Sequence, residues 1–183
     1  MAPAPRMTTD EYLRTPETLR PQELIYGALR CADAPSFHHQ DALFAFGVAL
    51  REHVRARRLG HVCLAPLDVI LDRERDLIVQ PDLLFISTAR FHIIRGRVWG
   101  APDLVLEVLS PHPRIGKLQE RIGWFAQYGV RECWLYHQDE NRLEILALSP
   151  DGVVARESFD ARTSIRSVVL PAFDRTLASI LED

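Results

Sequence analysis

Hydrophobic positions recur along the chain with two different periods, which predict both helices and strands. Between residues 36 and 58 they return at the spacing of one helix face, and Gly60 is the expected end of that helix. The hydrophobic residues of this face are Leu43, Phe46, Leu50 and Val54. Shorter helices are predicted over 9–14, 117–128 and 174–181, the first because Thr8 and Glu11 have the spacing of a capping box and the second ending at Gly129.

Runs rich in Val, Ile, Leu and Phe lie between these helices and predict strands. The expected strands are 61–71, 77–87, 102–109, 132–137, 143–148, 153–159 and 164–170, together with two short ones about Gly27 within 23–31. The runs 77–87 and 102–109 are as apolar as central strands that are buried on both faces. This order predicts an α/β fold with a mixed central sheet flanked by helices and additional C-terminal strands.

Length and composition fit one domain over residues 1–183, with 1–7 as a short disordered lead-in. No apolar run is long enough for a membrane span and the start lacks the apolar core of a signal peptide, so the expected location is the cytoplasm. The three cysteines are widely spaced and predict buried, reduced thiols. A formal net charge of -3 argues against a non-specific DNA coat protein. It remains compatible with an enzyme that reaches phosphates through a bound metal ion.

Two carboxylates interrupt otherwise apolar runs. Glu107 lies within Leu104–Leu109, and Asp82 lies within Ile78–Ile86. Burying an ionised carboxylate costs several kcal/mol unless a charge or a metal compensates it, so the pair favours a functional site. The alternative is that each carboxylate simply pairs with one of the many arginines, since 22 residues are basic and Lys117 is the only lysine among them.

Carboxylate oxygens on adjacent strands suit Mg²⁺ or Mn²⁺, which keep several waters and can polarise a phosphoryl oxygen. A glycosidase-type Asp–Glu pair is the competing interpretation of the same two residues. The flanking sequence favours the metal site.

Pro81-Asp82 followed by Glu107 resembles the Pro-Asp…(Asp/Glu)-x-Lys signature of restriction-endonuclease-like nucleases. The chain is similar, more specifically, to the Uma family of bacterial restriction-endonuclease-like proteins. The resemblance extends over roughly residues 8–180 and depends on stretches that occur in the family's order. They are Glu23–Gly27, His39-Gln40, Gln80–Asp82, Ala101–Pro111 and Tyr128–Leu135.

The resemblance implies roles for individual positions. Asp82 and Glu107 would be the metal ligands, with the carbonyl of Val108 as a third. Glu23 would hold a metal-bound water, although a surface carboxylate at a strand end is an equal alternative. His39 would position phosphate or another ligand, although a polar residue at a helix start explains it nearly as well.

The chain also departs from the family pattern. Leu109 stands where the superfamily signature has its lysine. The family's own lysine, on the following helix, falls on Arg121, and the acidic residue four positions earlier falls on Lys117. Lys117 could therefore serve as a displaced catalytic lysine, with Arg121 holding phosphate, or it could be a solvated residue at a helix start.

Two functions from different classes follow. The first is a Mg²⁺- or Mn²⁺-dependent endonuclease that hydrolyses DNA phosphodiester bonds, and the second is a catalytically silent module that kept the fold for binding or dimerisation. The resemblance also implies a homodimer, for which the predicted strands over 143–170 carry enough apolar residues to cover a partner.

Overall fold

The computed structural model describes residues 6–16, 18, 20–109 and 117–182. Within these residues the strands form two six-stranded sheets, which are called sheet A and sheet B here. In spatial order, sheet A is β2 (Ala28–Cys31), β1 (Gln22–Ile25), β5 (Leu77–Val79), β4 (Val69–Asp72), β8 (Arg97–Trp99) and β7 (Ile94–Arg95). Sheet B is β12 (Gly152–Phe159), β11 (Arg142–Ser149), β10 (Glu132–His137), β9 (Leu104–Leu109), β6 (Leu83–Ser87) and β3 (Gly60–Leu64). The helices are α1 (Thr9–Leu13), α2 (Phe37–Arg57), the 3-10 helix η1 (Thr88–Ile93), α3 (Leu118–Tyr128) and α4 (Leu177–Leu181).

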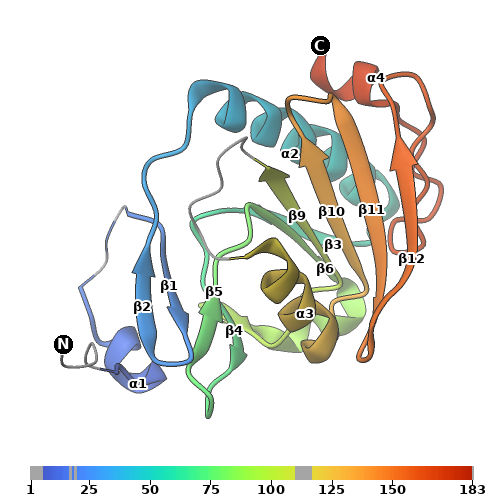
Figure 1. Ribbon diagram of the computed structural model, residues 1–183. Coiled ribbons are helices and arrows are strands. Elements are labelled where there is room, and N and C mark those ends of the chain that lie inside the picture. The colour runs from blue at the N-terminus through green and yellow to red at the C-terminus, as the bar shows by residue number, and fades with distance from the viewer. Residues whose placement is uncertain (1–5, 17, 19, 110–116, 183) are drawn as a thin grey trace.

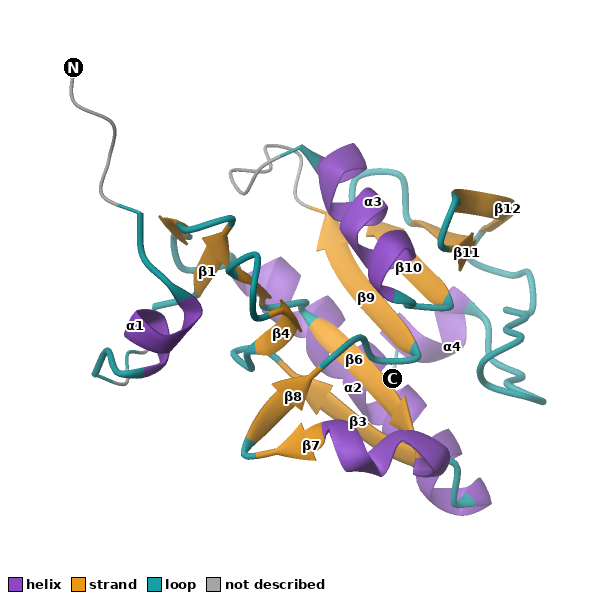
Figure 2. Cartoon of the chain, turned by 90° about the horizontal axis from the view of Figure 1, so that it is seen from below, coloured by secondary structure: helices purple, strands orange, loops and turns teal. Residues whose placement is uncertain are grey.

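Sheet B is the central layer, with α2 and α4 on one face and α3 on the other (Figures 1 and 2). Alternation along β9 explains how one strand serves both layers. Leu104 and Leu106 belong to the core beneath α2, whereas Val105 belongs to the core beneath α3. Glu107 follows the same alternation, which places it on the α3 face.

Sheet A lies beside sheet B and shares the core beneath α3, through residues such as Ile25 and Val69. Its other face is covered by α1, where Tyr12 packs on Leu24 and Ile78. Strand β1 of sheet A therefore has one face directed toward sheet B and α3. Neighbouring positions on β1 alternate, so Glu23 shares that face with Ile25.

The predicted helices are found, with changes at their ends. The capping box of Thr8 and Glu11 is present at α1. The prediction that Gly60 ends α2 is wrong: the helix ends at Arg57, and Arg58 takes the left-handed conformation of the C-cap (φ 54°). Gly129 caps α3 as predicted, with φ 96°. The closing helix begins at Leu177 rather than near 174, because Thr176 supplies the N-cap.

Two predicted strands are each divided between the two sheets. The run 61–71 contains β3 of sheet B and β4 of sheet A, and the run 77–87 contains β5 of sheet A and β6 of sheet B. Pro81 interrupts the second run, since a proline cannot donate to a strand ladder. The chain therefore crosses from one sheet to the other just before Asp82, and the α/β fold has two mixed sheets instead of one.

Three further differences concern a segment without a predicted element, a predicted strand and the predicted disordered lead-in. The segment 88–99 forms η1, β7 and β8, none of which was predicted. The predicted strand 164–170 is not a strand. Met7, assigned to a disordered lead-in, donates its backbone N–H to the Gly27 carbonyl at 2.8 Å, while residues 1–5 lie outside the described part. No helix in the described ranges is long and apolar enough to cross a membrane.

The segment 164–170 is held by side-chain hydrogen bonds instead of a strand ladder. The buried carboxylate of Glu132 accepts hydrogen bonds from the Trp134 indole (3.0 Å), the Ser167 hydroxyl (2.6 Å) and the Val168 and Val169 amides (2.6 and 3.3 Å). A single carboxylate thus satisfies donors from two parts of the chain. No alternation of hydrophobic residues could reveal this arrangement.

We expect Glu132→Ala to lower the free energy of unfolding by about 2–4 kcal/mol, because buried donors lose their acceptor. Urea denaturation measures the loss, and faster hydrogen exchange at the Val168 and Val169 amides locates it. Glu157→Ala is the matched control, since the Glu157 side chain is exposed and its one ion pair with a described residue is to Arg166 (3.4 Å). Unchanged exchange at both valine amides would contradict this role for Glu132.

Candidate active site

The antiparallel pairing of β6 with β9 brings Asp82 next to Glu107. Leu83 is paired with Leu106, so the next position of the same register sets Asp82, just before β6, opposite Glu107. The Val108 amide donates a hydrogen bond to Asp82 Oδ2 at 2.8 Å. Two carboxylates that are far apart in sequence are therefore neighbours at one end of β9.

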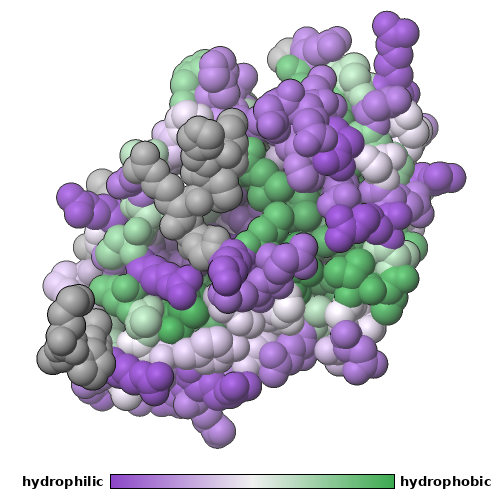
Figure 3. Space-filling view, viewed as in Figure 1, coloured by the Kyte–Doolittle hydropathy of each residue, from purple (hydrophilic) through white to green (hydrophobic). Residues whose placement is uncertain are grey.

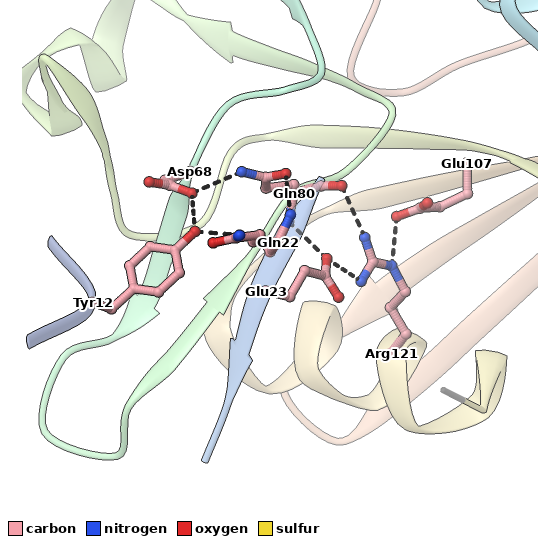
Figure 4. Close-up of polar contacts among 7 residues, drawn as sticks. All are labelled: Tyr12, Gln22, Glu23, Asp68, Gln80, Glu107 and Arg121. Atoms are coloured by element: carbon pink, nitrogen blue, oxygen red, sulfur yellow. Dashed lines mark hydrogen bonds and ion pairs between the residues drawn. The ribbon is translucent and has the colours of Figure 1, made fainter. Parts of the chain in front are cut away.

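Glu107 faces α3, where the guanidinium of Arg121 lies between acidic groups of both sheets (Figure 4). Arg121 Nε donates to Glu107 Oε1 at 2.7 Å, and Nη1 donates to Glu23 Oε1 at 2.7 Å. Nη2 donates to the Gln80 carbonyl at 3.2 Å. The backbone N–H of Gln80 donates in turn to Glu23 Oε1 at 2.7 Å. One guanidinium thus ties β9, β1 and the crossing segment before Asp82 together.

Burial controls the electrostatics of this cluster. Glu23, Glu107 and Arg121 are 2 %, 8 % and 7 % exposed. The pKa of Glu107 is raised to about 8, mainly by burial and further by the negative charges of Asp82 and Glu23, while Arg121 opposes the shift. Burial acts to lower the pKa of Arg121, but the charges of Glu107 and Glu23 outweigh it and leave that pKa raised. Arg121 stays charged, whereas Glu107 is poised to exchange a proton near neutral pH.

Asp82 is held differently from the two glutamates. His39, at the start of α2, places Nε2 3.2 Å from the same Asp82 Oδ2 that accepts from Val108. His39 is buried, and its Nδ1 has no hydrogen-bond partner among the described residues. No arginine of the described chain pairs with Asp82, although one does pair with Glu107. The alternative that both carboxylates are merely paired with arginines therefore fails for Asp82.

The acceptors that remain fit a divalent cation that keeps part of its water shell. Glu23 Oε2 is buried without a partner, and neither Asp82 Oδ1 nor Glu107 Oε2 accepts a hydrogen bond from the described residues. Three carboxylates and one guanidinium leave a formal charge of −2 when Glu107 is ionised. In the described ranges no group of three or more His, Cys, Asp or Glu side chains is arranged to hold a metal. Mg²⁺ is commonly bound through one or two carboxylates and keeps several of its waters.

The structure brings together most of the residues that the sequence singled out. Asp82, Glu107, Glu23, Arg121 and His39 form one connected cluster, with the Val108 backbone at its edge. Because Glu23 is buried, its interpretation as a surface carboxylate at a strand end is wrong. Arg121, predicted to hold phosphate, uses three of its five N–H groups on protein acceptors.

Lys117 forms no hydrogen bond or ion pair with the side chains of this cluster. It is the exposed N-cap residue of α3, one helical turn before Arg121, and it forms no ion pair with any described residue. The structure therefore places Arg121, and not Lys117, between the carboxylates.

Sequence reasoning missed the part played by Gln80. Its backbone contacts both Glu23 and Arg121, and its side-chain amide donates to Asp68 Oδ1 at 2.9 Å. Asp68 also accepts from the Tyr12 hydroxyl at 2.9 Å, so the site is continuous with the polar network of sheet A (Figure 4). The position of Gln80 directly before Pro81-Asp82 was the available indication.

Comparisons with known proteins place the chain in a family. A family model described as "Uma2: Putative restriction endonuclease" matches residues 9–178. A solved structure, titled as a "putative nuclease belonging to DUF820 from Anabaena variabilis ATCC 29413", is similar in fold with a TM-score of 0.79. Its sequence is 21% identical, and the match covers 96% of this chain and 98% of that one. No curated protein matches the sequence.

Proposed function

Because the chain belongs to the Uma2 family of restriction-endonuclease-like proteins, we propose that it is a Mg²⁺- or Mn²⁺-dependent endonuclease that hydrolyses DNA phosphodiester bonds. The observation that carries the proposal is the cluster of Asp82, Glu107 and Glu23 around Arg121, which has a formal charge of −2 when Glu107 is ionised. Each carboxylate keeps one oxygen without a hydrogen bond from the described residues. Such a cluster is costly to keep in a fold unless a cation compensates it.

Asp82 and Glu107 would hold the cation, with the Val108 carbonyl as a further ligand. When bound, a divalent ion polarises a phosphoryl oxygen and lowers the pKa of a coordinated water. The Val108 amide and His39 hold Asp82 through Oδ2, so Oδ1 would be available to the ion. Arg121 fixes Glu107 through Oε1 and leaves Oε2 for the same purpose. Glu23 Oε2 would accept a hydrogen bond from a coordinated water.

We expect the protein to cleave DNA with Mg²⁺ or Mn²⁺, and Asp82→Asn or Glu107→Gln to lower the rate at least about 100-fold, because each removes a ligand charge. The assay uses supercoiled, linear and single-stranded DNA with each metal and with EDTA. Asp151→Asn is the matched control, since Asp151 is exposed and remote from the cluster. Cleavage in EDTA, or an Asp82→Asn variant that is as active as the wild type, would contradict the proposal.

The second candidate is a silent module of the same fold, favoured by the engagement of Arg121. A guanidinium that donates three hydrogen bonds to protein acceptors is a poorer proton carrier than the lysine expected there. Titration with Mn²⁺ separates the two candidates. Binding that is lost in Asp82→Asn supports the nuclease, whereas no binding and no cleavage supports the module.

The substrate and the assembly belong to the same proposal. DNA is the substrate that the family's class suggests, the proposed location is the cytoplasm, and a homodimer would present two such sites to one duplex. The apolar residues of the late strands contribute mainly to the core beneath α2. Leu143, Ile145, Phe159, Ile165 and Leu170 are all buried in it. Of the large hydrophobic residues over 143–170, only Val153, Val154 and Val168 are exposed, at 41 %, 64 % and 74 %.

A further inference from the structure

Helix α2 carries exposed hydrophobic residues that no other part of the described structure covers. Phe37 is 77 % exposed, Phe44 66 % and Val48 42 %. Leu64 of β3 lies beside Gly47, where an added Cβ would come within 3.2 Å of it, and it is 39 % exposed. The stripe therefore continues from the helix onto the edge strand of sheet B.

Charged residues accompany this stripe on the same helix face. At 100° per residue, six exposed residues fall in one sector about 80° wide. They are Phe37, Asp41, Phe44, Val48, Arg51 and Arg55. Asp41, Arg51 and Arg55 form no ion pair with any described residue, whereas Arg73, Arg97, Arg142, Arg156 and Arg175 all do. The face thus combines uncovered hydrophobic residues with charges that lack partners.

The order of these residues is self-complementary about position 46. Asp41 and Arg51 lie five positions to either side of it, and Phe44 and Val48 lie two positions to either side. Phe37 and Arg55 lie nine positions to either side. A two-fold axis at this point sets each residue against its complement in an antiparallel copy of the helix, which is the requirement for an isologous interface. Phe44 meets Val48, Asp41 meets Arg51, and Arg55 lies over Phe37 in a cation–π contact.

We propose that this α2 face, Phe37 to Arg55, is the homodimer interface, formed by antiparallel packing of α2 on α2 of a second copy. The opposite edge of sheet B is less suited to pairing. β12 is an edge strand that exposes Val153 and Val154, but its Arg156 is already paired with Glu144 at 2.8 Å and its Glu157 with Arg166 at 3.4 Å. Charges on an edge strand oppose edge-to-edge association. The inference does not depend on catalysis, and it assigns the partner to the layer opposite α3.

Charge exchange tests the proposed pairing directly. We expect the wild type to be a dimer at 100 μM or below by sedimentation equilibrium, and Asp41→Arg and Arg51→Asp each to raise the dissociation constant at least about 30-fold. The reason is that two opposite-charge contacts become two like-charge contacts in each homodimer. An equimolar mixture of the two variants restores both opposite-charge contacts, so it forms a heterodimer of near wild-type affinity. The double variant D41R/R51D dimerises for the same reason.

The matched control is Arg57→Asp, which makes the same charge change on the same helix outside the stripe and leaves the dissociation constant unchanged. Circular dichroism confirms that each variant is folded. A monomeric wild type at 100 μM overturns the proposal. So does a dimer that tolerates Asp41→Arg, since its interface would lie elsewhere, and so do two monomeric variants whose mixture stays monomeric.

Discussion

We expect Arg121→Met to lower the free energy of unfolding by about 3–5 kcal/mol at pH 8.5, because removing one partner of a buried ion pair leaves its charge uncompensated. Methionine keeps most of the volume of the side chain and its flexible, unbranched stem. The loss therefore reports the charge and the three hydrogen bonds to Glu107, Glu23 and Gln80 rather than a cavity. Urea denaturation monitored by tryptophan fluorescence measures it.

Two further variants make this expectation specific. Arg73→Met is the control, because Arg73 forms an exposed ion pair with Asp10 at 2.8 Å and exposed pairs contribute at most about 1 kcal/mol. Adding Glu23→Gln to Arg121→Met should recover part of the lost stability, since a neutral amide replaces a buried charge. A loss in Arg121→Met as small as that in Arg73→Met would show that the guanidinium does not compensate the carboxylates.

The carboxylates of the site, Asp82 and Glu107, could be predicted from the sequence because they are charged residues within hydrophobic runs. Glu107 stands in a run of six residues that are otherwise hydrophobic, and Asp82 follows a proline between two apolar segments. Burying charge there requires compensation, so these two positions stand out in a single sequence. Arg121 was placed near the site only through the family pattern, since a helical arginine is ordinarily solvated.

The division into two sheets could not be anticipated in the same way. Alternation of hydrophobic residues shows that a segment is extended and buried, but it does not show which neighbour the strand pairs with. Both 61–71 and 77–87 are consistent with one long strand, although each changes sheet in the middle. Glu23 and Gln80 reach the site only because of that change. The burial of Glu23 therefore could not be predicted from its position near a turn.

The outer surface shows a similar limit. In the space-filling view of the α3 side, hydrophilic residues cover much of the surface, with hydrophobic residues showing between them (Figure 3). A single exposed hydrophobic residue is ordinary on a soluble protein. On α2 the exposed Phe44 and Val48 indicate an interface because Asp41 and Arg51, which form no ion pair with any described residue, lie on either side of them. Sequence spacing shows that these residues share a face, but only the structure shows that the face is uncovered.

We expect the stability of the metal-free protein to fall as pH rises from about 4.5 to about 8, because the pKa of Glu107 is raised from 4.5 to about 8 in the folded state. Between these values the folded protein keeps a proton on Glu107 that the unfolded chain has released, so rising pH favours unfolding. The lowered pKa of the buried His53 acts in the opposite sense near pH 6.5. The difference between wild type and Glu107→Gln, measured by urea denaturation across this range, isolates the contribution of Glu107.

With a divalent metal bound, stability should no longer fall as pH rises, because the ion binds the Glu107 carboxylate and displaces its proton. Below pH 8 the affinity for Mn²⁺ is therefore expected to rise about tenfold per pH unit, as one proton is released for each ion bound. Isothermal titration in buffers of different ionisation enthalpy measures both the affinity and that proton. In Glu107→Gln the affinity falls and its remaining pH dependence flattens, whereas Asp151→Asn leaves both as in the wild type. An affinity that is constant between pH 6 and 8, with no proton released, would mean that Glu107 is not a ligand of the ion.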